Sequence, residues 1–284
     1  MTAHPEIVAS FFTIAGDLLP HDPPLVARFP IRERITAASQ AGFTGMGFNF
    51  DDVADFRDHY DDATLRAMFA DAGIRWIELE ALIDWFADGE RGAAAEIQRR
   101  QALDQAAALG VFQIKVAGDL AGDWPIDRMT EAFAGLCREA AEAGTRITIE
   151  LLPFSNLDTV ARGRAVVEQA GEPNGGLMFD AWHVQRGGMA LAEIAALPAG
   201  MVAGIEFDDG PLAAEDADFY SDCVYNRRLP GEGAFDLAGL VAAARQTGFD
   251  GPWGIEILSN AYRALPLQDA ATRAFQAARR ILDR

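Results

Sequence analysis

Four short apolar runs of the sequence each end in a carboxylic acid. These acids are Glu150, Asp180, Glu206 and Glu256. The clearest run is residues 146–153, Arg-Ile-Thr-Ile-Glu-Leu-Leu-Pro, in which apolar and polar side chains alternate up to Glu150. Because successive side chains of a strand point to opposite faces, all four acids are expected on one face of their strands. This pattern indicates a single site supplied by several strands.

Convergent carboxylates predict a metal site. Carboxylates a few Å apart raise each other's pKa, so four of them cannot all stay ionised without a counter-charge. A divalent cation supplies that charge, and oxygen ligands favour Mn²⁺ or Mg²⁺ over Zn²⁺, with Co²⁺ as a further candidate. A single such acid is more simply an exposed loop residue or half of an internal ion pair. Four at matching positions favour one divalent ion bound by Glu150, Asp180, Glu206 and Glu256.

Two basic side chains are candidates to act beside these acids. His183 follows Asp180 by three residues, and it is a candidate metal ligand, substrate contact or general acid/base. A structural histidine near the rim of the site is the alternative. Lys115 is the only lysine of the chain, and alternation places it on the interior face near Glu78 and Glu80. An internal ion pair is its ordinary interpretation, and the Schiff-base nucleophile of an aldolase is the alternative.

Other candidates for substrate binding lie outside the strands. Arg227 and Arg228 precede a Leu-Pro-Gly-Glu-Gly turn, where one of them could bind an oxyanion or hydroxyl of a substrate. Trp85, Phe86 and Trp182 could form apolar walls for the faces of a sugar. Solvated loop charge and ordinary packing at the rim are the alternatives for these residues.

The segments that must position these residues alternate between strand-like and helix-like patterns. Strands are expected at 8–15, 43–50, 74–80, 111–116, around Glu150, and at 176–180, 201–207 and 252–258. Helices are expected at 30–40, 62–72, 92–109, 127–143, 157–170, 189–196, 235–247 and 267–282, several ended by a glycine such as Gly42 or Gly110.

Eight strand–helix units in 284 residues, with no linker rich in Pro, Ser or Gly, predict a single (β/α)₈ TIM barrel domain over residues 1–284. An open doubly wound sheet is the competing fold, but residues 15–20 do not form the Gly-rich phosphate loop that it needs after its first strand. In a barrel the carboxyl ends of the strands, and hence the four acids, gather at one mouth. The long connections 81–91 and 208–234 are expected over that mouth.

Composition narrows the classes of partner. The 24 basic and 43 acidic residues give a formal charge of −19, which argues against nucleic acid and against an anionic membrane surface. No segment approaches the ~20 apolar residues of a membrane span, and the first residues lack the basic and apolar regions of a signal peptide. Cys137 and Cys223 are far apart and read as free thiols in a reducing compartment, so a cytoplasmic protein is expected.

Four motifs resemble the xylose isomerase-like barrels, the family of sugar phosphate isomerases/epimerases also called AP endonuclease family 2. The motifs are residues 149–153, 180–183, 228–233 and 251–256, and the resemblance covers nearly the whole chain. It implies that Glu150 and Glu256 bind metal and act as bases from opposite faces of the substrate, and that Asp180 is a metal ligand. It also implies that His183 and Arg227 contact the substrate.

The chain departs from the family pattern at one metal position. Glu206 stands where many members have a metal-binding His and some dehydratases a Gln, and an all-carboxylate site is similar to that of the xylose isomerases. The early His–Asp pair of those isomerases has no evident counterpart. The endonuclease branch fits poorly, since it binds three metals through many histidines and this chain has four in all.

These observations predict a divalent-metal-dependent sugar or sugar phosphate isomerase/epimerase. It would act on a small polyhydroxylated carbonyl compound by abstracting the proton α to the carbonyl, through a metal-stabilised enediolate. Glu150 or Glu256 would remove the proton, and the other acid or His183 would return one. The alternative is a dehydratase of the inosose or 3-dehydroshikimate type. Remoter alternatives are a non-catalytic sugar-binding barrel and a Schiff-base aldolase that uses Lys115. The resemblance also implies a homodimer or homotetramer.

Overall fold

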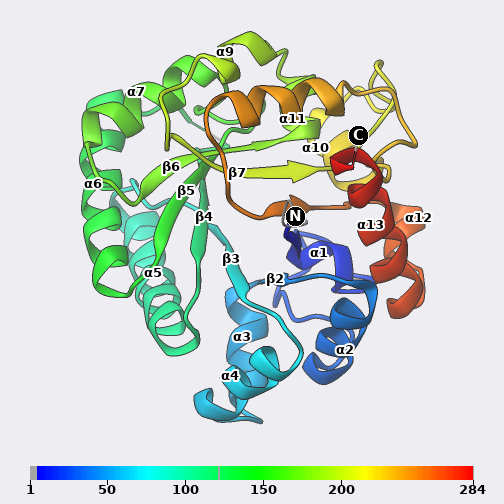
Figure 1. The fold of residues 1–284 in the computed structure, drawn as a ribbon. Helices are drawn as coiled ribbons and strands as arrows, with labels where there is room; N and C mark the ends of the chain where they lie inside the picture. Colours follow the sequence, from blue (N-terminus) through cyan, green and yellow to red (C-terminus); the bar gives the residue numbers. More distant parts are fainter. Residues whose placement is uncertain (1–4, 121, 284) are drawn as a thin grey trace.

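Eight parallel strands close into a barrel in the computed structural model, which describes residues 5–120 and 122–283 (Figure 1). Each strand pairs with its neighbours in the sequence, and β8 pairs with β1 to close the ring. The strands are β1 (Ile7–Ala9), β2 (Gly45–Phe48), β3 (Trp76–Leu82), β4 (Gln113–Ala117), β5 (Arg146–Glu150), β6 (Gly175–Asp180), β7 (Val202–Phe207) and β8 (Trp253–Ile255). The prediction of a (β/α)₈ TIM barrel is confirmed.

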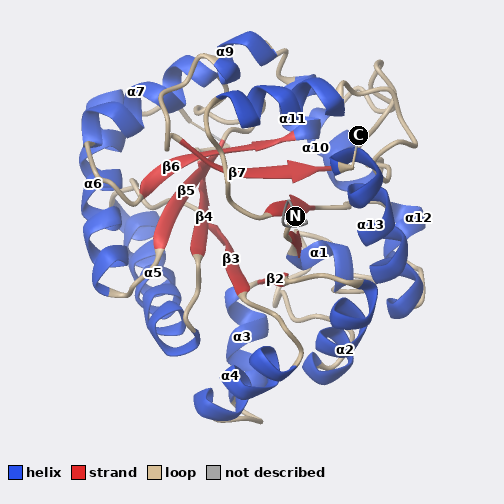
Figure 2. Ribbon diagram, in the orientation of Figure 1, coloured by secondary structure: helices blue, strands red, loops and turns tan. Residues whose placement is uncertain are grey.

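Helices surround the strands as an outer layer (Figure 2). The longer ones are α2 (Ile31–Ala41), α3 (Phe50–Arg57), α4 (Asp62–Asp71), α5 (Gly89–Leu109), α6 (Ile126–Glu142), α7 (Val160–Ala170), α11 (Leu237–Gln246) and α13 (Leu267–Leu282). The shorter ones are α1 (Phe11–Ile14), α8 (Ala181–Arg186), α9 (Leu191–Ala195), α10 (Phe219–Tyr225) and α12 (Asn260–Arg263).

The apolar pattern of each element matches the layer in which it lies. All residues of β6 and β7 are buried, as expected for parallel strands covered on both faces. Helix α13 buries Ala270, Ala274 and Ile281 on one face at helical spacing, and packs against α2. Gly42 and Gly110 end α2 and α5 with left-handed backbone, as their positions in the sequence predicted.

The first strand is shorter than predicted. The sequence pattern placed a strand over residues 8–15, but β1 ends at Ala9 and a helical turn, α1, follows Ser10. The backbone N–H of Phe11 donates to the carboxylate of Glu80 and not to a neighbouring strand, so the chain leaves the sheet at this point. Alternation of apolar residues could not reveal this, because the competing partner is a side chain distant in the sequence.

Several short helices were also not predicted, and two of them, α8 and α10, carry residues of the barrel mouth. Helix α8 starts directly after β6, where the Asp180 side chain accepts a hydrogen bond from the backbone N–H of His183 at 3.1 Å.

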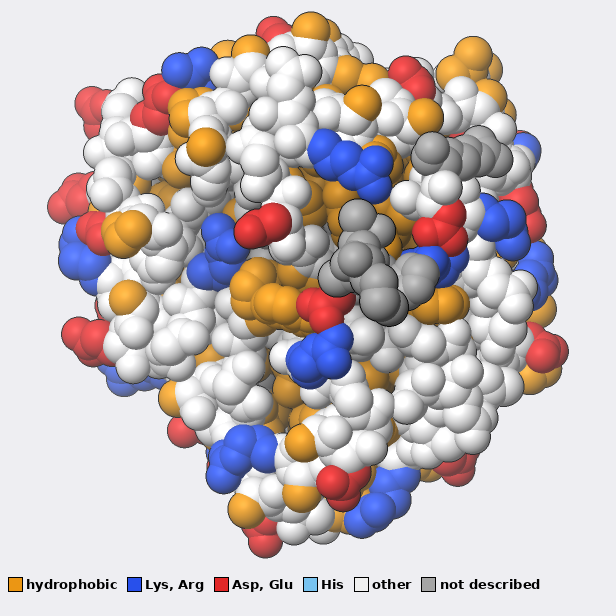
Figure 3. All heavy atoms as spheres, in the orientation of Figure 1, with side chains coloured by type: hydrophobic (Ala, Val, Ile, Leu, Met, Phe, Trp, Pro, Cys, Tyr) orange, Lys and Arg blue, Asp and Glu red, His pale blue; other side chains and the backbone are white. Residues whose placement is uncertain are grey.

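Charged side chains of both signs are interspersed on the molecular face shown in Figure 3. None of the helices within residues 5–120 and 122–283 is long and apolar enough to cross a membrane.

Candidate active site

A cavity of about 710 Å³ opens beyond the carboxyl ends of the strands. Its polar lining includes Glu150 at the end of β5, Glu256 directly after β8, His183 of α8 and Arg227 from the connection 208–234. Its apolar lining includes Phe12, Leu25, Ile83, Leu120, Phe154 and Tyr220. The mouth of the barrel therefore combines ionisable groups at its floor with apolar and aromatic walls.

Three acids of the strand ends converge here, and two of them, Glu150 and Glu256, line the cavity. Glu150, Glu206 and Glu256, here called the outer cluster, each offer a carboxylate oxygen within 4.8 Å of the others. In the strand register Glu206 pairs with Gly254, which places Glu256 further toward the mouth. A Cβ at position 254 would lie 2.6 Å from Cγ of Glu206, so only glycine leaves room for that side chain inside the barrel. The structure thus brings together three of the four predicted metal ligands.

The outer cluster has the chemistry of a site for a divalent cation. Oε2 of Glu206 is buried and has no hydrogen-bond partner among the described residues. Burial raises the pKa of Glu206 and of Glu256 well above the ordinary value, and neighbouring carboxylates raise both values further. The positive charge of Lys115 opposes this shift at Glu206, and that of Arg227 opposes it at Glu256. These buried oxygens lack sufficient positive charge, and an oxygen-preferring ion such as Mn²⁺ or Mg²⁺ would supply it.

Glu150 differs from the other two acids because a histidine faces it. Nε2 of His183 lies 3.3 Å from Oε1 of Glu150. Burial acts to raise the pKa of Glu150, but the hydrogen bond and charge of His183, with the charges of Lys115 and Arg227, lower it to about 2. Glu150 is therefore ionised at neutral pH.

The imidazole of His183 is held by aromatic rings. Phe154 and Trp182 contact it edge-on, with ring centroids 5.8 and 5.3 Å away. Nε2 also lies 3.5 Å from Nη2 of Arg227, and the buried Nδ1 has no hydrogen-bond partner within the described part of the chain. His183 is thus oriented toward Glu150 at the cavity wall.

Arg227 lies at the centre of a second group of acids. Its Nη1 is 3.0 Å from Oδ2 of Asp180, 2.8 Å from Oδ2 of Asp208 and 3.1 Å from Oε2 of Glu256, and all four side chains are buried. Asp180 is the fourth predicted metal ligand. Its Oδ2 pairs with Arg227, and its Oδ1 accepts a hydrogen bond from the backbone N–H of His183. Asp180 therefore does not join the outer cluster. A guanidinium surrounded by carboxylates stays charged, and it neutralises part of their charge.

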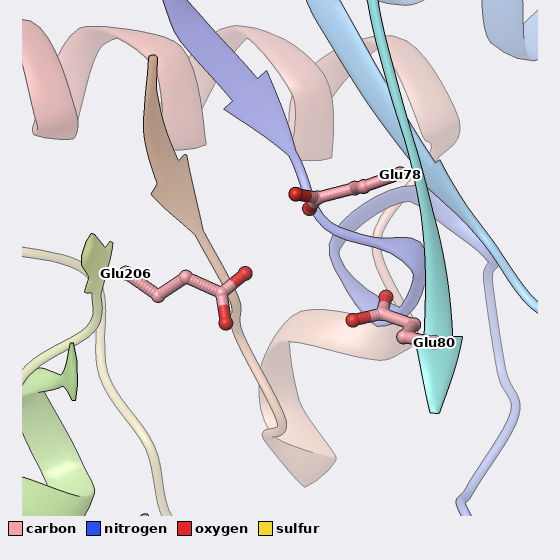
Figure 4. Close-up of side chains that lie close together, drawn as sticks. All are labelled: Glu78, Glu80 and Glu206. Atoms are coloured by element: carbon pink, nitrogen blue, oxygen red, sulfur yellow. The ribbon is translucent and has the colours of Figure 1, made fainter. Parts of the chain in front are cut away.

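Lys115 lies below the mouth, where its ammonium is enclosed by three glutamates. Nζ is 2.6 Å from Oε2 of Glu80 and 3.2 Å from Oε1 of Glu78, and it also contacts Oε1 of Glu206. Figure 4 shows the carboxylates of these glutamates, two from β3 and one from β7, pointing toward one another. Burial acts to lower the pKa of Lys115, but the charges of Glu206, Glu78 and Glu80 raise it well above its ordinary value.

This position contradicts two expectations for Lys115. It is fully buried and does not line the mouth cavity, so it cannot contact a substrate bound there. Because the pKa of Lys115 is raised, its amine is protonated at neutral pH and lacks the lone pair that a Schiff-base nucleophile needs. The ordinary interpretation, an internal ion pair, describes the contacts that the structure contains.

The two tryptophans that were expected to form walls of the cavity, Trp85 and Trp182, do not line it. Trp85 is buried between Phe86 and Phe133 and donates its indole N–H to the carbonyl of Ala117 at 2.8 Å. Trp182 is 1% exposed and supports the site from behind. Neither ring lines the mouth cavity, because each follows a strand end by a few residues and turns back into the packing between elements.

Two acids of the site region were missed from the sequence. Asp208 follows Glu206 by two residues, so the alternation that identified Glu206 also predicts Asp208 on the same face. Asp209 accepts hydrogen bonds from the backbone N–H groups of Gly231 and Phe235 at 2.9 and 3.0 Å. These hydrogen bonds hold the turn that follows Arg227, and no local sequence pattern predicts them.

Fold and geometry define a (β/α)₈ barrel with a carboxylate-rich site at its mouth. A family model described as "Xylose isomerase-like TIM barrel" matches residues 35–282, and the chain belongs to that family. The family resemblance inferred from the sequence motifs is thereby confirmed.

Individual relatives carry several activities. A 3-dehydroshikimate dehydratase of Pseudomonas aeruginosa is 27% identical over 240 residues, which cover 82% of this chain. The chain spans 37% of the length of that relative. A solved structure described as an IOLI protein with a bound zinc atom superimposes with a TM-score of 0.84 at 17% identity, covering 98% of each chain. An L-ribulose 3-epimerase superimposes with a TM-score of 0.73 at 19% identity, covering 99% of this chain and 95% of its own. These structures support the fold.

Proposed function

We propose that this chain is a divalent-metal-dependent enzyme that moves a proton α to the carbonyl of a small polyhydroxylated compound, as an isomerase or epimerase. The observation that carries this proposal is the convergence of Glu150, Glu206 and Glu256 within 4.8 Å of one another, with Glu150 and Glu256 lining the mouth cavity. The unpartnered, buried Oε2 of Glu206 supports a cation at that point. The dehydratase and epimerase relatives support catalysis in this family.

Glu150, Glu206 and Glu256 would hold the metal ion, for which oxygen ligands favour Mn²⁺ or Mg²⁺. When bound, the ion would supply Lewis-acid polarisation of the substrate carbonyl and stabilise the charge that develops on its oxygen. The zinc atom named for the IOLI protein supports a metal in this fold, though not the choice of metal. Asp180 would join as a fourth ligand only if Arg227 released it.

Glu150 and Glu256 are the proposed acid–base pair. Glu150 ends β5 and Glu256 directly follows β8, three strands apart around the barrel, so they would reach the substrate from different sides. Glu150, ionised and oriented by His183, would take the α-proton. Glu256, beside the guanidinium of Arg227, would return a proton to the opposite face of the same carbon or to its neighbour.

The cavity supports a small, sugar-like substrate. Its volume of about 710 Å³ lies within the usual range of small-molecule sites. Phe12, Phe154 and Tyr220 offer surfaces against which the C–H faces of a polyhydroxylated ring or chain can pack. Asn49, Gln98 and Gln101 add neutral hydrogen-bonding groups for its hydroxyls.

A dehydratase is the second candidate, and the 27% identity to a 3-dehydroshikimate dehydratase over 82% of the chain favours it. The two reactions begin with the same removal of an α-proton by Glu150. They differ in the next step, because a dehydratase expels a β-hydroxyl as water where an epimerase returns a proton to carbon. His183 at the cavity wall would be placed to protonate that leaving hydroxyl.

The first test is metal content by mass spectrometry on untagged protein, for the wild type, Glu150→Gln and Glu256→Gln. We expect about one divalent ion per chain in the wild type and a marked loss in both variants, since each removes a ligand. Glu232→Gln is the matched control, because Glu232 is exposed on the 208–234 connection and its nearest partner, Arg273, lies 3.6 Å away on the surface. Absence of metal after titration with Mn²⁺, Mg²⁺ and Co²⁺ would refute the proposal.

The second test identifies the reaction. Ketoses, their phosphates, keto-cyclitols and 3-dehydroshikimate would be incubated with the metal-loaded enzyme in D₂O and followed by NMR. Deuterium at the α-carbon of a recovered or rearranged substrate indicates the isomerase or epimerase. Loss of water to a conjugated product indicates the dehydratase. Binding without either change would support a sugar-binding barrel and overturn the assignment as an enzyme.

A further inference from the structure

The glutamates around Lys115 form a second carboxylate cluster that shares one member with the metal site. Glu78, Glu80 and Glu206, here called the inner cluster, have carboxylate oxygens within 4.8 Å of one another. The carboxylate oxygens of the outer cluster lie equally close together, and Glu206 belongs to both clusters. The two clusters differ in what lies inside them, because the inner one contains the ammonium of Lys115.

The remaining oxygens of the inner cluster are occupied by protein donors. Oε2 of Glu78 accepts a hydrogen bond from Nε2 of Gln113 at 2.7 Å, and Oε1 of Glu80 accepts the backbone N–H of Phe11. Oε1 of Glu206 faces Lys115. Only Oε2 of Glu206 has no donor among the described residues, and this is the buried atom left for the outer cluster.

We propose that Lys115 is an internal cation that restricts the barrel to one divalent ion: its ammonium fills the inner cluster and leaves a single oxygen of Glu206 for the outer one. Lys115 is then a positioning residue that sets metal number, while the outer cluster holds the ion. This inference rests on the proposed metal-dependent function.

Charge and the shared ligand Glu206 both support this role. Carboxylate-bridged pairs of divalent ions in enzymes lie about 3.5–4 Å apart. Two clusters that share Glu206 offer ligands for such a pair. The ammonium prevents it, because it takes the ligand oxygens of the inner cluster and repels a second cation from within a buried, weakly screened site. Without Lys115 the inner cluster would keep three carboxylates and no positive charge.

The experiment compares Mn²⁺ stoichiometry in the wild type, Lys115→Ala and Lys115→Met, by calorimetric titration and by electron paramagnetic resonance. We expect one Mn²⁺ per chain in the wild type. Lys115→Ala removes both charge and volume, and we expect two ions with the resonance of an exchange-coupled pair. Lys115→Met removes the charge but fills the space, so it should bind one ion. Lys115→Ala combined with Glu78→Gln should return to one ion.

The outcomes separate this inference from the proposed function. One ion of unchanged affinity in both the wild type and Lys115→Ala would overturn the role of Lys115 and leave the metal enzyme intact. Two ions in the wild type would also overturn it. No ion in the wild type but one in Lys115→Ala would refute the proposed function and the limit of one ion, and would leave only the exclusion of a divalent ion from the inner cluster by the ammonium. No ion in either protein would refute both.

Lys115→Ala buries uncompensated carboxylates, so its folding is part of the test. If the variant is unfolded as purified, it would be refolded from urea with Mn²⁺ and without it. Recovery of the folded far-UV circular dichroism spectrum only with Mn²⁺ supports the inference, because a divalent ion then replaces the ammonium. Failure to recover with Mn²⁺ overturns it.

Discussion

Replacing Arg227 by Met tests whether the guanidinium holds the acids of the barrel mouth together. Nη1 of Arg227 lies within 3.1 Å of carboxylate oxygens of Asp180, Asp208 and Glu256, and all four side chains are buried. Methionine keeps most of the apolar stem of the side chain and removes its charge. The variant therefore leaves three carboxylates in a buried site without their shared cation.

The size of the effect follows from opposing terms. Each pair at about 3 Å contributes on the order of 5 kcal/mol of attraction at an effective dielectric constant of about 20. Burying the guanidinium costs several kcal/mol, so the ion pairs add little net stability compared with an apolar core. Removing one partner alone is different, because the remaining charges stay buried, and the expected loss is about 4 kcal/mol. That loss corresponds to a fall in Tm of about 10 °C for a chain of this size.

The assay is urea unfolding at neutral pH with EDTA, monitored by circular dichroism, so that bound metal does not contribute. The matched control is Arg228→Met at the next position, where the side chain is 39% exposed and pairs with Glu215 at 2.8 Å. A surface pair of this kind contributes less than about 1 kcal/mol. A loss below about 1 kcal/mol for Arg227→Met, or equal losses for both variants, would refute the electrostatic account of this region.

Three further predictions concern residues outside the two carboxylate clusters. Gly233→Ala would place a Cβ on the Asp209 carboxylate, so we expect a loss of about 2 kcal/mol in urea unfolding, and an unchanged midpoint would contradict this packing. Burial acts to raise the pKa of Asp222, but the hydrogen bond from Arg186 lowers it, so its stabilising effect is complete above an unfolded-state pKa near about 4 and is lost as pH falls through the folded-state value. Asp222→Asn should therefore flatten the decline of stability below about pH 4, and an acid limb as steep as that of the wild type would oppose this assignment. Burial raises the pKa of the Cys137 thiol to about 12, so iodoacetamide should alkylate it in urea but not in the folded protein, as peptide mass spectrometry would show.

Local sequence patterns predicted most of the strands and helices of the barrel. Alternation in period two located the strands, and glycines such as Gly42 and Gly110 marked where helices end. Alternation also placed Glu150 and Glu206 on the interior face of their strands, and Lys115 near Glu78. These are properties of adjacent residues, so they can be predicted without knowing which strands are neighbours.

Other parts of the site depend on where distant segments meet. Asp180 has the same sequence signature as Glu206, yet it pairs with Arg227 because the connection 208–234 folds back over the mouth. Trp85 and Trp182 follow strand ends, as cavity residues often do, but packing turns both rings away from the cavity.

The sequence by itself determined the barrel, the face and the strand end on which each acid lies. Only the tertiary structure decided which acids share a cation, and that the cation inside the inner cluster is Lys115. The physical reason is that side-chain direction follows from local backbone geometry, whereas the distance between carboxylates on different strands depends on register around the closed barrel. In this protein that register places Glu206 opposite Gly254, where its carboxylate belongs to both clusters.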